Sequence, residues 1–91
     1  MNKQLNILHL EDEPDFAELV RTLLSQDGLD IEVKRVGDRL AFNQAMEGGK
    51  YDLIISDYHL PSFTGLEALA IARKSHPHTP FILVSLSLIH I

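Results

Sequence analysis

The apolar positions along the chain fall into two alternating kinds of segment. Short, nearly continuous apolar runs predict strands that helices cover on both faces. They lie at 5–10, 53–56 and 81–84. A further strand is expected at 31–36, where apolar and charged residues alternate imperfectly, as they do in a more exposed strand.

The segments between these strands show helical spacing. After Pro14, apolar residues recur at the i, i+3, i+4 spacing of one helix face. They are Phe16, Leu19, Val20, Leu23 and Leu24. Gly28 fits the carboxyl-terminal cap of this helix. A second helix is expected at 39–47, and a third begins near Thr64, because Thr64 and Glu67 have the spacing of a capping box.

The alternation of strands and helices predicts the fold class. Strands joined by helices through short connections favour right-handed crossovers and an open, doubly wound parallel sheet of the α/β class. Ligands of such sheets gather beyond the carboxyl ends of the strands. With 91 residues the chain is one small domain, and its stability is expected to be marginal.

The composition excludes several classes of function. The formal net charge of −5 argues against a nucleic-acid-binding surface. The chain has no cysteine, and therefore no disulfide framework and no thiolate chemistry. Its first residues lack the basic start and long apolar stretch of a signal peptide, and no apolar run is long enough to span a membrane. We therefore expect a cytoplasmic domain without a membrane contact.

Three acidic residues are expected at one edge of the sheet. Glu11 and Asp12 come directly after the first strand, and Asp57 ends the third. Adjacent parallel strands would bring their carboxyl groups together, where like charges disfavour joint ionisation. A hard cation with oxygen ligands relieves that repulsion, so the sequence predicts a Mg²⁺ site. Since Mg²⁺ also takes phosphate oxygens, Asp57 is a candidate nucleophile for a phosphoryl group.

Helix capping is the structural alternative for these acids. Glu11 and Asp12, taken alone, fit residues that cap the helix after the first strand. Asp57 lies too far before Thr64 to cap the third helix. The three acids together therefore favour a functional site.

Three longer segments together resemble the receiver domain of two-component response regulators. They are LHLEDEPD at 8–15, LIISDYHLPSFTGLEAL at 53–69 and PFILVS at 80–85. Each is weak evidence by itself, but the acidic pair, the strand-end Asp57, the Leu-Pro and the Gly have the expected relative spacing. The resemblance covers about residues 5–85 and implies the flavodoxin-like, CheY-like fold of that family.

The resemblance also implies roles for individual residues. Asp57 would be the phosphoacceptor and a Mg²⁺ ligand, Asp12 a direct Mg²⁺ ligand, and Glu11 a ligand through a metal-bound water. The backbone carbonyl of His59 would complete the protein ligands. Ser85 would be the switch hydroxyl that follows the phosphoryl group. Glu11 replaces the more usual Asp, and its longer side chain still suits a contact through water.

These roles imply a phosphorylation switch that assists its own phosphotransfer and is not an enzyme. A histidine kinase or a histidine phosphotransfer protein would donate the phosphoryl group to Asp57. Two alternatives stay open. An aspartate-nucleophile phosphatase would resemble a DxD pattern, whereas Asp57-Tyr58-His59 offers no second acid. A non-signalling receiver-like binding module, or an inert truncated fragment, would keep the fold without accepting a phosphoryl group.

The chain departs from the family after the strand at 81–84. A receiver continues with a helix, a fifth strand that ends in a Lys, and a last helix, and this α-β-α portion is missing. The lysines lie at positions 3, 34, 50 and 74, so none supplies that cation. We expect 1–85 to be a partial receiver domain and 86–91, LSLIHI, to be a tail foreign to the family that resembles a translated sequencing adapter. The last strand would then be an exposed edge, prone to aggregation or strand exchange.

Overall fold

The computed structural model describes residues 4–61 and 63–85, and the tail predicted at 86–91 lies outside them. The strands are β1 (Leu5–Leu10), β2 (Ile31–Val36), β3 (Leu53–Asp57) and β4 (Phe81–Val84). The helices are α1 (Pro14–Ser25), α2 (Arg39–Gly48) and α3 (Gly65–Ser75). Strands and helices alternate in the predicted order. None of these helices is both long and apolar enough to cross a membrane.

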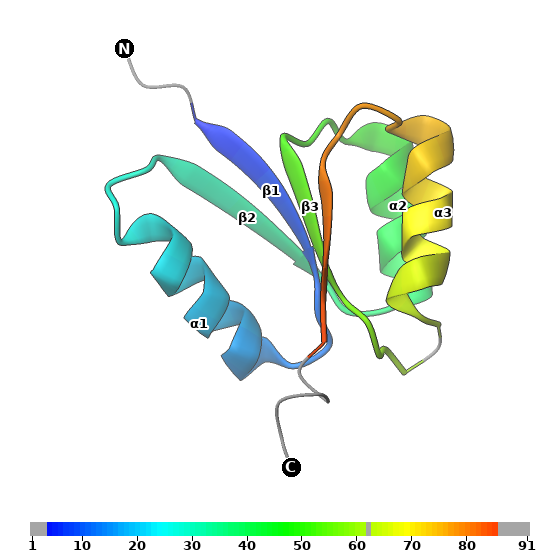
Figure 1. Ribbon diagram of the computed structural model, residues 1–91, viewed down its shortest axis with the longest axis horizontal. Coiled ribbons are helices and arrows are strands. Elements are labelled where there is room, and N and C mark those ends of the chain that lie inside the picture. The colour runs from blue at the N-terminus through cyan, green and yellow to red at the C-terminus, as the bar shows by residue number, and fades with distance from the viewer. Residues whose placement is uncertain (1–3, 62, 86–91) are drawn as a thin grey trace.

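The four strands form one parallel sheet in the order β2-β1-β3-β4. β1 pairs with both neighbours, so that Leu10 lies opposite Val36 of β2 and opposite Ser56 of β3. Helix α1 lies on one face of the sheet, and α2 and α3 lie on the other (Figure 1). This is the doubly wound α/β architecture that the sequence predicts, and it places the two central strands between helices on both faces.

The main core lies between the central strands and the helix pair α2 and α3. Leu8 and Leu10 of β1 and Ile54 of β3 are completely buried there. Phe42 of α2 is also completely buried, and its ring centroid lies 6.0 Å from that of Phe63. Fully burying an aliphatic or aromatic side chain of this size stabilises the fold by about 1.5–3 kcal/mol. This half of the domain therefore carries most of the apolar burial.

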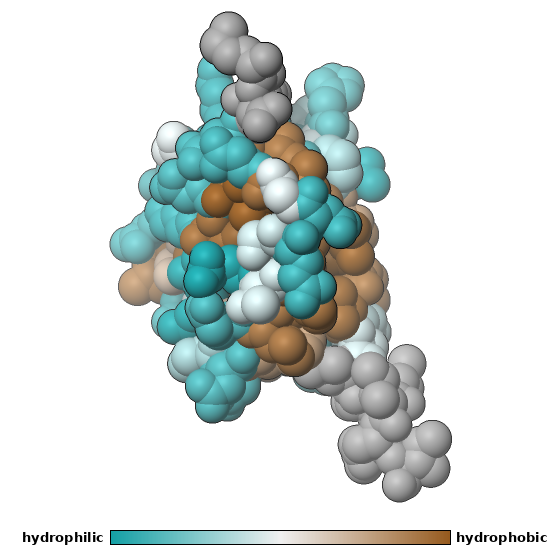
Figure 2. All heavy atoms as spheres, turned by 90° about the vertical axis from the view of Figure 1, so that its left-hand side faces the viewer, coloured by the Kyte–Doolittle hydropathy of each residue, from teal (hydrophilic) through white to brown (hydrophobic). Residues whose placement is uncertain are grey.

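The face covered by α1 is packed less completely. Ala17 is the buried residue of α1, whereas Leu19 and Leu23 are 52% and 53% exposed. Ile82 of the edge strand β4 is 47% exposed. Figure 2, turned toward the side on which α1 and β2 lie, shows wide apolar areas between the polar ones. The edge position of β4 agrees with the expected exposed strand, while aggregation and strand exchange through it stay predictions.

The helix ends show one confirmed prediction and one difference. At the start of α3, Thr64 Oγ1 accepts a hydrogen bond from the Glu67 amide (3.2 Å), and Glu67 Oε1 accepts one from the Thr64 amide (2.9 Å), which completes the capping box. Helix α1 ends at Ser25 with Gln26 as its cap, so Gly28 is not the cap. Gly28 lies in the following turn with φ of 78°, a conformation that glycine adopts without strain.

Candidate acidic metal site

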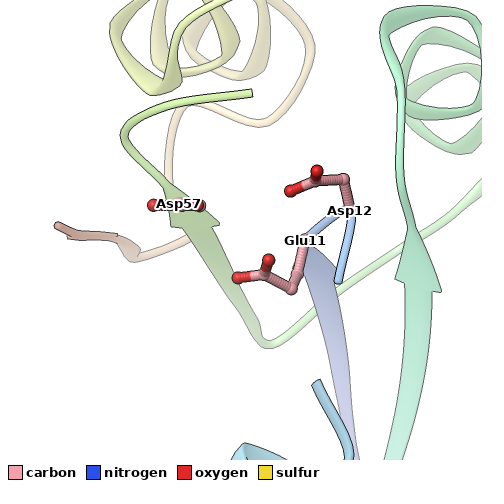
Figure 3. A group of neighbouring side chains, drawn as sticks. All are labelled: Glu11, Asp12 and Asp57. Carbon is pink, nitrogen blue, oxygen red and sulfur yellow. The ribbon is translucent and has the colours of Figure 1, made fainter. Parts of the chain in front are cut away.

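The central strands bring three acidic side chains to one end of the sheet. Glu11 and Asp12 follow β1, and Asp57 is the last residue of the neighbouring strand β3. One carboxylate oxygen from each residue lies within 4.8 Å of the other two. Figure 3 shows the three carboxyl groups converging from the two strand ends. The sequence-based expectation that adjacent parallel strands cluster these acids is confirmed.

The three carboxyl groups differ in their exposure to solvent. Asp12 is exposed and Asp57 is half-buried, but Glu11 is only 2% exposed. Glu11 Oε2 accepts a hydrogen bond from the Glu13 amide (3.1 Å). Glu11 Oε1 is buried and has no hydrogen-bond partner in the described part of the chain. A buried carboxylate oxygen without a donor is costly, so this atom points to a cation or a cation-bound water as its missing partner.

The electrostatics of the cluster agree with this interpretation. Burial raises the pKa of Glu11 above its ordinary value, and the nearby charges of Asp57 and Asp12 raise it further, although the hydrogen bond from Glu13 opposes these effects. The protein therefore holds an acid that resists ionisation beside two other acids. A divalent cation with oxygen ligands removes the repulsion and favours the ionised form of all three. The residues present thus fit a Mg²⁺ ion.

Helix capping does not explain the pair after β1. The N-cap of α1 is Glu13, whose Oε1 accepts a hydrogen bond from the Asp15 amide (3.3 Å). Neither Glu11 nor Asp12 caps the helix, so the capping interpretation of these two residues is wrong. The cap of α1 lies two residues after Glu11 and one after Asp12, so the acidic pair is left at the strand end.

The other two predicted site residues lie on segments that border the acidic cluster. His59 follows β3 and is exposed, and its ring packs edge-on against Tyr58 with centroids 5.0 Å apart. Ser85 is half-buried and comes directly after Val84, the residue of β4 that pairs with Asp57. The Tyr58 amide donates to the Val84 carbonyl at 2.8 Å, which ties the two segments together. The roles of the His59 carbonyl and of the Ser85 hydroxyl stay predictions.

Two side chains lie beside the cluster for which no role there was predicted from the sequence; His9 was expected only as a core or interface histidine with its hydrogen bonds satisfied. His9 of β1 is 2% exposed, its Nδ1 has no hydrogen-bond partner among the described residues, and burial lowers its pKa. Arg35 of β2 donates a hydrogen bond from Nη1 to the backbone carbonyl of Glu11 (2.8 Å). The alternation of charged and apolar residues in β2 indicated only a solvated position for Arg35. Its contact with Glu11 depends on strand pairing, which no local pattern reveals.

Comparison with known proteins identifies a family. The family described as the response regulator receiver domain matches residues 7–88. Transcriptional regulatory protein YkoG of Bacillus subtilis (strain 168) is 36% identical over 80 residues, which is 88% of this chain and 34% of the relative. Luminescence regulatory protein LuxO of Vibrio campbellii is 34% identical over 79 residues, or 84% of this chain and 16% of LuxO. The chain therefore spans about a third or less of these curated relatives.

Solved structures share the fold. The response regulator TrrA of Thermotoga maritima, in complex with Mg²⁺-BeF, is 30% identical with a TM-score of 0.72, covering 93% of this chain and 70% of that one. The receiver domain of the sensor histidine kinase PA1611 of Pseudomonas aeruginosa PAO1, with a magnesium ion in its active-site cleft, is 26% identical with a TM-score of 0.76. That match covers 89% of this chain and 66% of the other. With its parallel sheet, its acidic strand ends and a family match over most of its length, this chain belongs to the response regulator receiver domain family.

Proposed function

We propose that this chain is a phosphoacceptor domain, which takes a phosphoryl group onto Asp57 with Mg²⁺ bound at Glu11, Asp12 and Asp57. The observation that carries the proposal is the buried, unpartnered Oε1 of Glu11 in a cluster of three carboxyl groups that lie within 4.8 Å of one another. Such an arrangement is unfavourable without a cation. Asp12 and Asp57 would be direct ligands, Glu11 would act through a metal-bound water, and the His59 carbonyl would complete the protein ligands.

The chemical step is a phosphoryl transfer to a carboxylate. In transfer from a phosphohistidine, an oxygen of Asp57 attacks phosphorus in line with the bond between phosphorus and the imidazole nitrogen. That bond breaks, and the imidazole of the donor leaves and takes up a proton. The product on this chain is an acyl phosphate. When bound, Mg²⁺ supplies the positive charge that lowers the cost of bringing a phosphoryl group beside carboxylates. The half-buried position of Asp57 leaves the nucleophile accessible from solvent.

The donor that suits this chemistry is a phosphohistidine on a histidine kinase or a histidine phosphotransfer protein. Ser85 comes directly after the residue that pairs with Asp57, so its hydroxyl would donate to a phosphoryl oxygen and transmit the new charge to the segment after β4. The output is a changed surface, so the domain acts as a switch and has no turnover on an external substrate.

The proposal is tested by intact-mass spectrometry after incubation with Mg²⁺ and acetyl phosphate, whose transferable group leaves acetate behind. The wild-type chain is expected to gain the mass of one phosphoryl group, and excess EDTA is expected to prevent the gain. Asp57→Asn should abolish it. Asp27→Asn, in the exposed turn after α1, is the matched control and should leave it unchanged.

Other outcomes contradict the proposal. A folded wild-type chain that gains no mass would support a non-signalling binding module or an inert fragment. An adduct that survives Asp57→Asn would place the modification elsewhere. Steady release of phosphate from small phosphate esters would favour a phosphatase.

A further inference from the structure

The guanidinium of Arg35 lies outside the acidic cluster and holds the backbone that carries Glu11 and Asp12. Arg35 lies opposite His9 in the pairing of β2 with β1, and its side chain reaches past the end of β1. Nη1 donates a 2.8 Å hydrogen bond to the carbonyl oxygen of Glu11. Hydrogen bonds from a charged guanidinium are about twice as strong as neutral ones. The contact therefore restrains this carbonyl more firmly than a neutral donor would.

The restrained carbonyl belongs to the peptide that joins Glu11 to Asp12. Because a peptide unit is planar, fixing its carbonyl direction also fixes the direction of the Asp12 amide. The preceding amide, that of Glu11, donates to the Val36 carbonyl at 2.9 Å. The last two residues of β2 thus hold both backbone polar groups of Glu11. Together these bonds limit rotation of the Glu11–Asp12 peptide, which sets where the Asp12 side chain leaves the backbone.

Gly37 makes room for this contact. A Cβ atom at position 37 would lie 3.2 Å from Arg35 Nη1 and 3.7 Å from the Glu11 carbonyl oxygen. The first distance is tighter than most side-chain contacts, so a methyl group here would require the guanidinium to move by a few tenths of an ångström. The absence of a side chain at Gly37 is therefore part of the arrangement that lets Arg35 reach Glu11.

We propose that Arg35 is a positioning residue of the metal site, which sets the direction of the Asp12 carboxyl group by holding the Glu11–Asp12 peptide. Arg35 touches no reacting atom, and it acts through the backbone of the acidic pair. The consequence of this inference, a change in Mg²⁺ affinity, rests on the proposed function. The restraint on Asp12 itself belongs to the metal-free chain and can be tested separately.

The charge of Arg35 and its hydrogen bond predict opposite effects on the metal. A positive charge near a cation site weakens cation binding, so removal of the charge alone would strengthen Mg²⁺ binding. Loss of a positioning contact weakens binding, and partners of metal ligands typically contribute about 10–100-fold to affinity. The sign of the change in affinity therefore separates the two roles.

The first experiment measures Mg²⁺ affinity by isothermal titration calorimetry for the wild type, Arg35→Met and Arg35→Lys. We expect Arg35→Met to bind Mg²⁺ about tenfold more weakly, and Arg35→Lys, which keeps a charged donor, to lie between. Arg35 and Arg21 both line a hollow of about 270 Å³ between α1 and β2, but Arg21 forms an ion pair with Glu18. Arg21→Met is therefore the matched control. Its affinity should equal that of the wild type.

The second experiment needs no metal. In nitrogen-15 NMR relaxation with EDTA, the Asp12 amide of the wild type should show an order parameter near the rigid value of about 0.85, and Arg35→Met should lower it toward about 0.6. Gly37→Ala keeps the arginine but crowds it, so it should act in the same direction. Arg21→Met should change nothing at Asp12.

The outcomes separate this inference from the proposed function. Unchanged or tighter Mg²⁺ binding by Arg35→Met, with an unchanged order parameter at Asp12, would overturn the positioning role and leave the metal site intact. A wild type that binds no Mg²⁺ would overturn the proposed function, while the order parameter would still decide whether Arg35 restrains Asp12.

Discussion

Leu10 of β1 lies directly opposite Ser56 of β3 in the parallel pairing of the two central strands. Each is followed by an acidic residue, so the register brings Glu11 level with Asp57. A shift of the register by one residue would turn these side chains to opposite faces of the sheet. The strand pairing, and not the acidic residues alone, therefore creates the cluster.

The Mg²⁺ ion of the proposed function should stabilise the fold, because its three acidic ligands come together only in the folded chain. At 100 times its dissociation constant, a ligand specific for the folded state adds about 2.7 kcal/mol to the free energy of unfolding. Each kcal/mol raises Tm by roughly 4–8 °C in a domain of this size. Thermal unfolding followed by circular dichroism, with Mg²⁺ and with EDTA, measures the difference. Asp12→Asn should lose most of the Mg²⁺-dependent rise in Tm. A rise in this variant equal to that of the wild type would contradict the assignment of Asp12 as a Mg²⁺ ligand.

Glu11→Gln should stabilise the metal-free protein near neutral pH. Burial raises the pKa of Glu11 above 4.5 in the folded state, so from that pH upward the folded chain holds more protons than the unfolded chain. The free energy of unfolding therefore falls as the pH rises through the raised pKa. The neutral amide removes this loss, so Glu11→Gln should be more stable than the wild type at pH 7 in the absence of metal.

Urea unfolding in EDTA between pH 4 and pH 8 checks this prediction. The stability advantage of Glu11→Gln over the wild type should grow as the pH rises through the raised pKa of Glu11, and this difference cancels the opposite contribution of His9, whose pKa burial lowers. Mg²⁺ should stabilise the variant much less than the wild type. Glu32→Gln, on the exposed side of β2, is the matched control and should follow the wild type. Parallel pH profiles for wild type and Glu11→Gln would contradict the raised pKa of Glu11.

Gly65→Ala should disturb the junction between α3 and the end of β3. A Cβ atom at Gly65 would lie 2.6 Å from the Asp57 carbonyl oxygen and 2.5 Å from Leu83 Cδ2. Leu83 can move, but the backbone of Asp57 is held in the sheet, so α3 must shift outward. Overpacking of this kind costs about 1–3 kcal/mol.

The effect of Gly65→Ala is measured as the shift of the urea midpoint. The same displacement should reduce the rate of phosphorylation by acetyl phosphate, since it acts on the backbone of Asp57. Gly48→Ala is a useful comparison, because a Cβ atom at Gly48 meets nothing within 4 Å. Similar losses in both variants would show that the crowding at Gly65 is not the cause.

Phe42→Ala should unfold the domain or leave it barely stable. Phe42 is completely buried against Phe63, and truncation of a buried phenylalanine costs about 3–5 kcal/mol. Small domains have about 5–15 kcal/mol of stability in total. Leu40→Ala on the same helix removes a side chain that is 68% exposed, so a change within about 0.5 kcal/mol is expected. Equal losses would contradict the placement of the core on the inner face of α2.

Several features of this protein were determined by local sequence. Nearly continuous apolar runs predicted β1, β3 and β4, and an imperfect alternation of apolar and charged residues predicted β2. The run at β4 did not mean burial on both faces, because this strand lies at the edge of the sheet and is partly exposed. Thr64 and Glu67 determined the start of α3, because a capping box is made by residues three apart in the chain. The acids at the ends of β1 and β3 could also be located from the sequence, because they stand directly at the ends of apolar runs. Their clustering was predicted from the adjacency of parallel strands.

Only the tertiary structure decided what distinguishes these acids from one another. Burial of Glu11, the exposure of Asp12 and the bond from Arg35 to the Glu11 carbonyl all depend on residues that are distant in the chain. The same holds for Glu13, which is the N-cap of α1 because the helix begins at Pro14 and leaves the acidic pair outside it. Desolvation and hydrogen bonding are set by three-dimensional neighbours, so periodicity and composition placed the carboxyl groups but the packed fold alone gave each its environment.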